Sequence, residues 1–237
     1  MSSSTTSLGG TSNTFAFQPS ASQLILYAFG RCGIRGPQLQ AEHMRDAVTA
    51  LNMIQSDWAN DQVNLWTVEL ITVPLVFGQI AYPVPENVIL ILDAYLEINP
   101  GTSAPIDLYM YPISRTEYAA FPNKVSPGRP TTYWFDRTLS PVVNLWQPPD
   151  DASQTFNYYA CRQIQDIGTQ NSQQPEIPYP WLKAFSDALS VELAIIYAPE
   201  KVQILQTAAM MSYKRAKAMG AERSALYLFP GINNYFR

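Results

Sequence analysis

The sequence predicts an α+β protein in which helices at both ends of the chain enclose an inserted β module. Residues 20–60 and 175–226 carry apolar side chains at helical spacing, whereas residues 64–166 divide into short runs rich in β-branched and aromatic residues. A chain of 237 residues can also bury a core without disulfides or metals. We therefore expect an antiparallel helical bundle, an inserted antiparallel β-sandwich or barrel, and extended termini, because this arrangement buries every apolar stripe.

The N-terminal region is expected to form a flexible arm and two helices. Residues 1–19 are rich in Ser, Thr, Gly and Asn, which is typical of disordered chain ends. Ser20 or Ser22 can cap a helix over residues Gln23–Arg31, and Gly33 can end it. The second helix carries one apolar stripe, whose members are Met44, Val48, Leu51, Ile54 or Gln55, and Trp58.

The middle of the chain is expected to supply six or seven short strands. They are Leu65–Val73, Leu75–Tyr82, Val88–Ile98, Ile106–Tyr111, Thr131–Asp136, Val142–Trp146 and Thr155–Ile164. Strands of this length and spacing are typical of small antiparallel sandwiches and barrels. Between them, Ser114 and Glu117 form a capping-box pattern, which predicts a helix of one or two turns that ends near Phe121.

Two further helices are expected after the β module. Pro180 can start the first, and Pro199 interrupts the pattern before the second, which we expect to run from about Glu200 to Glu222. The apolar line of the first helix consists of Leu182, Phe185, Leu189, Leu193 and Ile196. That of the second consists of Val202, Leu205, Ala209, Ala216 and Met219.

The last eleven residues include four aromatic side chains, whereas chain ends are normally polar. Such a segment either folds back onto its own core or inserts into another subunit, and the sequence leaves both open. The predicted organisation is an N-terminal arm over residues 1–19, a helical domain over 20–62 and 175–226, a β module over 63–174, and a C-terminal aromatic arm over 227–237.

The composition favours a protein whose surface contacts other proteins. Charged residues make up 14% of the chain, against about 25% in a typical globular protein. Aromatic residues make up 12%, and there are 19 prolines. Interfaces deplete charge and favour aromatic side chains, although an ordinary β-rich globule has the same composition. The net charge of −4 shows no basic footprint for gripping DNA.

No targeting or membrane-spanning segment is expected. The N-terminus lacks the basic and apolar regions of a signal peptide, and runs such as Val88–Leu92 are too short to cross a bilayer. We therefore expect a soluble protein that is synthesised in a cytoplasm. Cys32 and Cys161 have no motif spacing and are expected to be small buried side chains, with a disulfide between them left open.

A search for reactive groups finds no catalytic constellation, no metal site and no cofactor motif. His43 is the only histidine, and Gly30–Gly36 lacks the spacing of a phosphate-binding loop, so we interpret that run as a turn between helices. Asp150 and Asp151 follow two prolines, as in a solvated turn. Lys214, Arg215 and Lys217 form a basic cluster near a helix C-terminus, where the macrodipole favours positive charge. They are candidate channel or interface charges.

Two stretches resemble a known family. In the first, Asp46-Ala47 precedes Leu51-Asn52 and Trp58 on one helix, and a short turn and a strand follow. In the second, the segments are Ile113–Tyr118, Pro122–Lys124, Gly128–Pro130 and Leu145–Asp150. Together they resemble the head-to-tail adaptor (connector, or packaged-DNA-stabilisation) proteins of short-tailed bacteriophages, over roughly residues 20–166.

This resemblance implies a structural virion protein and no enzymatic activity. It implies a homo-oligomeric ring of about twelve subunits, docked beneath the portal protein at the neck of the virion. The ring would continue the DNA channel, let DNA pass during ejection, and attach tail nozzle, tube or fibre proteins. In such adaptors the C-terminal segment commonly docks on the portal. By position, the portal-binding residues here would be Tyr227, Phe229, Tyr235, Phe236 and Arg237.

Two alternative functions are weighed beside this one. A virion-associated glycan or cell-wall hydrolase needs paired carboxylates, for which Glu117 and Asp150 are the candidates. A carbohydrate-binding baseplate module needs aromatic platforms, for which Trp134 and Trp146 are the candidates. Both tryptophans fall within expected strands, where such residues are more often part of the sheet core.

Overall fold

The computed structural model describes residues 14–15, 17–61, 65–168 and 173–220. The chain divides into two compact units. The helical unit comprises residues 1–50 and 170–237, and the sheet unit comprises residues 51–169. The division falls within the second helix, so that helix contributes to both units.

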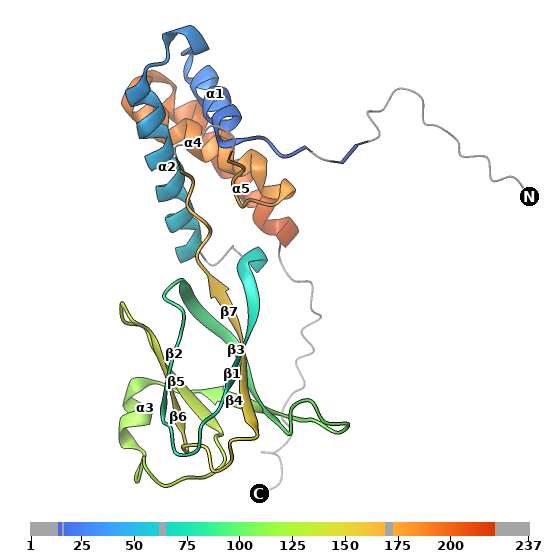
Figure 1. The fold of residues 1–237 in the computed structure, drawn as a ribbon. Helices are drawn as coiled ribbons and strands as arrows, with labels where there is room; N and C mark the ends of the chain where they lie inside the picture. Colours follow the sequence, from blue (N-terminus) through green and yellow to red (C-terminus); the bar gives the residue numbers. More distant parts are fainter. Residues whose placement is uncertain (1–13, 16, 62–64, 169–172, 221–237) are drawn as a thin grey trace, which may run out of the picture. The chain divides into compact units, whose positions relative to one another are not determined.

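The helical unit is built on the packing of three helices. Helix α4 (Leu182–Tyr197) packs against both α1 (Ala21–Cys32) and α5 (Val202–Gly220) (Figure 1). The first half of α2 (Ala41–Asn60) belongs to the same unit. Short 3-10 turns precede the helices at Gly36–Gln38, Tyr179–Trp181 and Pro199–Lys201. The largest fully buried side chains of this unit are Ile25, Phe29, Phe185, Leu189 and Leu193.

The ends of α1 follow the predicted capping signals. The Ser20 hydroxyl accepts a hydrogen bond from the Gln23 backbone N–H, and the Gln23 side chain accepts one from the Ser20 N–H. Gly33 ends the helix at a φ of 94°, in the left-handed region that glycine adopts without strain. Ser20, and not Ser22, is therefore the cap.

Two predicted apolar positions are exposed. Ile196 on α4 is 60% exposed, and Met219 on α5 is 75% exposed. Ile196 lies in the last turn of α4, where Ala194 is buried, and Ala198, the C-cap, is also buried. Met219 lies in the last turn of α5, three residues beyond the buried Ala216. In both helices, apolar residues at helical spacing therefore continue beyond the last buried position of the helix.

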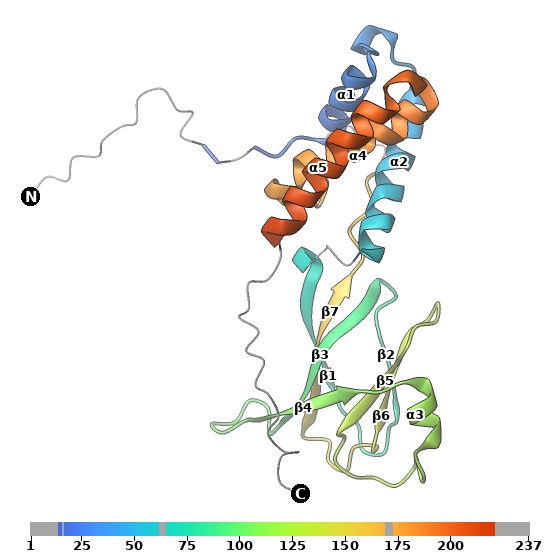
Figure 2. The same cartoon turned by 180° about the vertical axis from the view of Figure 1, so that it is seen from behind.

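The sheet unit contains one curled, mixed sheet of seven strands, in the order β1-β7-β3-β4-β5-β6-β2 (Figure 2). In chain order the strands are β1 (Val68–Pro74), β2 (Ala81–Pro83), β3 (Val88–Ile98), β4 (Ile106–Pro112), β5 (Thr132–Asp136), β6 (Val142–Trp146) and β7 (Gln154–Arg162). Alternate side chains of these strands form one core, whose largest members are Tyr133, Phe156, Tyr158, Leu96, Met110 and Leu145.

The expectation of an antiparallel module is wrong at one strand pair. Strands β4 and β5 run parallel, with Tyr111 beside Thr132. The connection between them contains the helix α3 (Arg115–Ala120), and a crossover of this kind is what a parallel pair requires. The described strands form a single sheet, whereas the sequence favoured a sandwich or a closed barrel.

Two predicted strands differ most from expectation. Of the run Leu75–Tyr82, only Ala81 and Tyr82 lie in a strand, β2, because Gly78 adopts a φ of 73° in a turn before it. The run that begins at Leu65 starts as a 3-10 turn and becomes β1 at Val68. The bounds of β3 and β6 agree with the prediction.

The second half of α2 binds an extended segment of the sheet unit. The Asn52 side chain donates to the Ile167 carbonyl at 3.0 Å and accepts from the Ile167 N–H at 2.9 Å. Ile164, Ile167 and the α2 residues Leu51, Ile54 and Trp58 are buried. The predicted stripe of α2 is thus a packing face from Leu51 onward.

Candidate interaction surfaces

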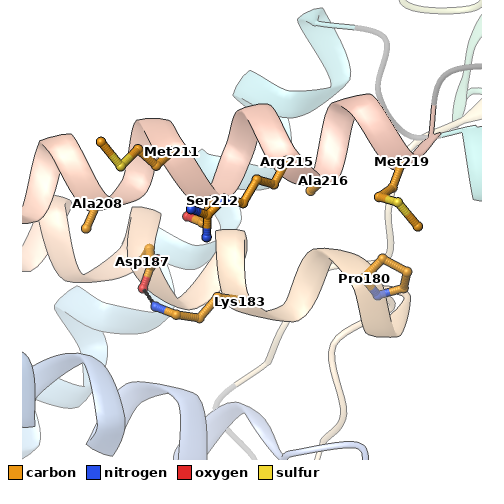
Figure 3. Close-up of a pocket in the computed structure, with 9 residues that line it drawn as sticks. All are labelled: Pro180, Lys183, Asp187, Ala208, Met211, Ser212, Arg215, Ala216 and Met219. Carbon is orange, nitrogen blue, oxygen red and sulfur yellow. Dashed lines mark hydrogen bonds and ion pairs between the residues drawn. The ribbon is translucent and has the colours of Figure 1, made fainter.

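An open apolar groove lies between α4 and α5 of the helical unit (Figure 3). Its volume is about 440 Å³. The residues that line it are Pro180, Lys183, Asp187, Ala208, Met211, Ser212, Arg215, Ala216 and Met219. Met211 and Met219 are largely exposed, and Lys183 and Arg215 add positive charge. The groove is therefore an apolar surface with cationic side chains among its lining.

A buried charge network supports this groove. Asp187 on α4 is 1% exposed, and its carboxylate forms ion pairs with Arg31 of α1 and Lys183 of α4. The Arg31 guanidinium also donates to the Ser190 hydroxyl at 3.5 Å. A carboxylate in such a position requires a cationic partner, because an unpaired buried charge is costly. The network joins α1 to α4, and nothing about it indicates catalysis.

The predicted basic cluster lies on exposed positions of α5. Arg215 lines the groove, whereas Lys214 and Lys217 lie one helical turn apart on another side of the helix. The Lys217 ammonium lies 5.8 Å from the centroid of the Tyr213 ring. Helix α5 contains no Asp or Glu, so its exposed side is entirely cationic or neutral.

A second groove of about 570 Å³ adjoins the first. The two share Pro180 and Lys183 as lining residues. Its exposed aromatic residues are Phe17, Tyr27 and Tyr179. Together the grooves form a continuous apolar surface of the helical unit, and surfaces of this kind mark interaction sites in soluble proteins.

The predicted portal-binding residues lie outside the described part of the chain. They are Tyr227, Phe229, Tyr235, Phe236 and Arg237. The segment that contains them follows Gly220 at the end of α5. The predicted N-terminal arm is described only at residues 14–15 and 17–19.

The histidine and the glycine run have structural roles. The His43 ring lies 5.7 Å from Phe29 and 4.8 Å from Tyr197, measured between ring centroids. Its Nδ1 accepts a hydrogen bond from the Gln40 backbone N–H at 2.8 Å, at the start of α2. The predicted turn at Gly30–Gly36 begins only at Gly33, which adopts the left-handed conformation, because Gly30–Cys32 form the last turn of α1.

The candidate carboxylates of a hydrolase also have local structural partners. Glu117 accepts a hydrogen bond from the Ser114 N–H at 2.7 Å, which lowers the pKa of its carboxyl group. Asp150 accepts one from the Gln154 side chain at 3.3 Å. Asp151 accepts from the backbone and hydroxyl of Ser153, and these bonds lower its pKa. These interactions are those of a helix cap and a turn.

The two candidate carbohydrate platforms are packed against other rings. Trp146 stacks on Phe121 at 4.1 Å with an interplanar angle of 11°. Trp134 lies 5.3 Å from the Tyr118 ring. Helix α3 and its C-cap supply both covering rings, so these faces of the tryptophans are occupied by the protein itself.

Other classes of site were sought in the described residues. Within them, no three or more His, Cys, Asp or Glu side chains are grouped as a metal site would require. The helices of this same part of the chain include none that is long and apolar enough to cross a membrane. Cys32 and Cys161 are both buried, and no disulfide joins them. Burial raises the pKa of the Cys32 thiol, although Lys201 and Arg31 oppose this rise.

Sequence reasoning did not identify the groove. It named Pro180, Arg215, Ala216 and Met219 for other reasons, but not Lys183, Asp187 or Met211. One signal was present, because Asp187 follows Lys183 by four residues and falls among the buried positions of α4. The groove itself depends on how α4 and α5 pack, which spacing along one helix does not reveal.

Comparison with known proteins identifies one family. A family model described as "SU10 adaptor protein" matches residues 25–228, which include nearly every helix and strand described above. A search of curated proteins finds no match. The family match agrees with the resemblance to phage head-to-tail adaptors seen in the sequence. The chain therefore belongs to the SU10 adaptor protein family, a family of structural bacteriophage proteins.

Proposed function

We propose that this protein is a subunit of the head-to-tail adaptor ring that lies beneath the portal at the virion neck. The observation that carries the proposal is the family match over residues 25–228. The ring, of about twelve copies, would continue the DNA channel and attach nozzle, tube or fibre proteins of the tail. Its work would be done by surfaces that bind other proteins, and no catalytic role is proposed.

The uncovered apolar surfaces of the helical unit support this proposal. The two adjoining grooves expose Met211, Met219, Tyr27 and Tyr179. A monomer that never met a partner would leave this apolar area in water at a cost in free energy. A closed ring with rotational symmetry also needs two different patches on each subunit. The helical unit therefore has surface available for a neighbour or for the portal.

We assign the C-terminal arm to portal binding. Its aromatic residues are Tyr227, Phe229, Tyr235 and Phe236, and Arg237 follows them. Aromatic side chains give large contact areas at a low cost in side-chain entropy. An arm that is already tethered to the ring also binds at a high effective concentration.

We assign Lys214, Arg215 and Lys217 to the channel or to an interface between subunits. The net charge of −4 on each chain opposes tight binding of phosphates, so we expect weak contacts with DNA. A conduit benefits from weak contacts, since DNA must slide through it.

Binding to purified portal rings tests the proposed function. We expect the full chain to form a complex with portal rings, visible by electron microscopy as an added layer, and mass photometry to count the bound copies. The Tyr235→Ala/Phe236→Ala variant should weaken this complex. The Phe77→Ala variant removes an exposed aromatic residue of the sheet unit and serves as the matched control.

One result would contradict the adaptor role, and another would contradict only the assignment of the C-terminal arm. If the full chain forms no complex with portal rings, the adaptor role is wrong. If Phe77→Ala weakens the complex as much as the tail variant does, the adaptor role stands and the assignment of the C-terminal arm is wrong.

A further inference from the structure

One face of the sheet unit presents tyrosine and acidic side chains to solvent. Residues Leu70 on β1, Tyr159 on β7, Tyr95 on β3, and Tyr109 and Tyr111 on β4 lie on the side of the sheet opposite to its core. The register places Leu70 beside Tyr159, and Tyr95 beside Tyr109. Asp93, Glu97 and Asp107 belong to the same side of β3 and β4. We call these eight residues the tyrosine face.

The tyrosine face is negatively charged and largely exposed, with Tyr95 and Glu97 half-buried. Leu70, Tyr109, Tyr111 and Tyr159 are each exposed over two fifths or more of their surface. Three of its eight residues are carboxylates, and none is a lysine or an arginine. An apolar and aromatic sheet face of this extent is unusual on a monomer, because the free side of a sheet is normally polar.

Two of the carboxylates are placed where they repel each other. Glu97 and Asp107 are direct cross-strand neighbours in the β3–β4 register. Like charges at opposed positions of an antiparallel pair destabilise the sheet. A cationic group that lies across both carboxylates would relieve this repulsion. The register itself therefore favours a positively charged partner.

Hydrogen bonds hold this face in place. The Glu97 carboxylate accepts from the Thr155 hydroxyl at 3.2 Å and from the Asn157 amide at 3.0 Å. The Tyr109 hydroxyl donates to Asp93 at 3.4 Å. Burial raises the pKa of Tyr95, and the nearby Tyr159, Asp107 and Glu97 raise it further, which places these groups in one cluster. The face is thus arranged before any partner binds.

The same chain carries a surface of complementary chemistry. On α5, Gln203, Thr207, Met210, Lys214 and Lys217 recur at intervals of four and three residues, so they form one stripe along the helix. All five are exposed. The stripe holds two ammonium groups and an exposed methionine, and α5 contains no acidic residue. We call it the α5 stripe.

We propose that the tyrosine face of one copy binds the α5 stripe of a second copy. Lys214 and Lys217 would lie against Asp107, Glu97 and Asp93, and Met210 would pack on the tyrosine rings. Ammonium groups and thioethers both bind favourably to aromatic rings. This proposal rests on the proposed function, because it assumes a ring of subunits. The tyrosine face and the α5 stripe would be the two different patches that a heterologous interface needs.

Charge complementarity decides in favour of a second copy. The tyrosine face carries three negative groups and no positive one, whereas the α5 stripe carries two positive groups and no negative one. Steering between opposite charges also speeds the encounter of subunits and suppresses wrong registers. Binding between two tyrosine faces, or between two α5 stripes, would place like charges together.

Zero-length cross-linking of the full chain tests this interface without the portal. Equal amounts of unlabelled and nitrogen-15-labelled protein would be mixed and treated with a carbodiimide, which joins a carboxylate directly to an ammonium group. We expect mixed-isotope cross-links from Asp93, Glu97 or Asp107 to Lys214 or Lys217. If every cross-link of these pairs joins two halves of the same isotope and none is mixed, the contact lies within a chain, and if these cross-links are absent altogether, the contact does not exist. Either result overturns the proposal.

Charge reversal with rescue provides a second test. Asp93→Lys/Asp107→Lys together, and Lys214→Glu/Lys217→Glu together, should each weaken self-association in sedimentation velocity by about tenfold or more, because close attractive pairs become repulsive. The quadruple variant combines both changes, which reverses the net charge of both surfaces, and should recover most of the lost affinity. Glu86→Lys and Arg45→Glu make reversals at exposed positions outside both surfaces and should change little. A quadruple variant as weak as its parents would contradict the proposal.

These outcomes separate the two proposals. If the full chain does not bind portal rings, the adaptor role is wrong, but the cross-links between copies would still form. Absent cross-links with intact portal binding would remove only the contact between the tyrosine face and the α5 stripe.

Discussion

Asp187 shows how a single residue can define the packing of a helical unit. Its carboxylate is almost completely buried on α4, yet two cations from different helices reach it. Arg31 contributes from α1, and its side chain is only 19% exposed, whereas Lys183 lies on α4 itself and is 60% exposed. The pair between Arg31 and Asp187 is therefore the one that solvent screens least.

Removal of Asp187 should strongly destabilise the helical unit. We expect Asp187→Ala to lower the free energy of unfolding by about 3–5 kcal/mol, because it leaves the Arg31 guanidinium without its ionic partner. Lys183→Met should cost less than about 1 kcal/mol, since an exposed ion pair contributes little. Urea denaturation followed by circular dichroism measures both. Equal losses for the two variants would show that the exposed pair, and not the buried one, carries the network.

Tyr197 should make the protein sensitive to alkaline pH. Its hydroxyl donates to Asp46, and this hydrogen bond, together with burial and the charges of Asp46 and Glu42, raises its pKa to about 12. The folded protein thus holds the phenolic proton more tightly than the unfolded chain does. The resulting stability is complete below about pH 10 and is lost as the pH rises from 10 through 12.

Two variants test this pH dependence. Tyr197→Phe should lose less stability over that range than the parent protein does. It should not abolish the loss, because Tyr133 and Tyr158 also have a pKa raised to about 12 by burial. Asp46→Asn should lower the pKa of Tyr197 toward its ordinary value in a tyrosinate absorbance titration. An unchanged titration curve would show that Asp46 does not control this phenol.

At the scale of elements, local signals predicted structure wherever one residue type decides the geometry. The cap at Ser20, the capping box at Ser114 and Gly33 as the end of the first helix are local, and the structure confirms all three. The parallel pairing of β4 with β5 was not predictable in this way. It depends on where the connection through α3 places β5. The alternation of apolar residues along a strand is the same in parallel and antiparallel pairs.

Helix α3 illustrates how a short element can protect larger ones. Its capping box holds six residues in a helix, and from this position Tyr118 and Phe121 lie against Trp134 and Trp146. A helix this short has little stability of its own. The cap and the aromatic packing must therefore support each other.

Loss of the α3 cap should expose Trp146. We expect Ser114→Ala to cost about 0.5–2 kcal/mol and to shift tryptophan fluorescence to longer wavelength, as Phe121 leaves the indole ring. Ser114→Thr keeps a hydroxyl that can cap and should retain the spectrum of the parent. If Ser114→Ala changes stability but not fluorescence, the aromatic stack does not depend on the helix.

At the scale of the whole molecule, the sequence predicted the order of helices, strands and helices, and the structure shows it. The interaction surfaces were harder to predict. The tyrosine face depends on the register of four strands, two of which are distant in the chain, and the groove depends on the packing of α4 and α5. Tyr109 and Tyr111 were visible in the sequence only as part of an alternating strand. Which side of that strand faces solvent became known only when its neighbours were placed.

The division into two units predicts two separable unfolding events. Each unit has its own core, and Leu189 in the helical unit and Leu145 in the sheet unit are both completely buried. Replacing either with alanine removes the same side chain and should cost about 2–5 kcal/mol. Hydrogen exchange measured by mass spectrometry should show faster exchange in peptides of the altered unit and little change in those of the other, because units with separate cores open independently. If Leu189→Ala and Leu145→Ala each accelerate exchange throughout the chain, the two units unfold as one. In that case, a partner that binds the sheet unit would also change the stability of the helical unit.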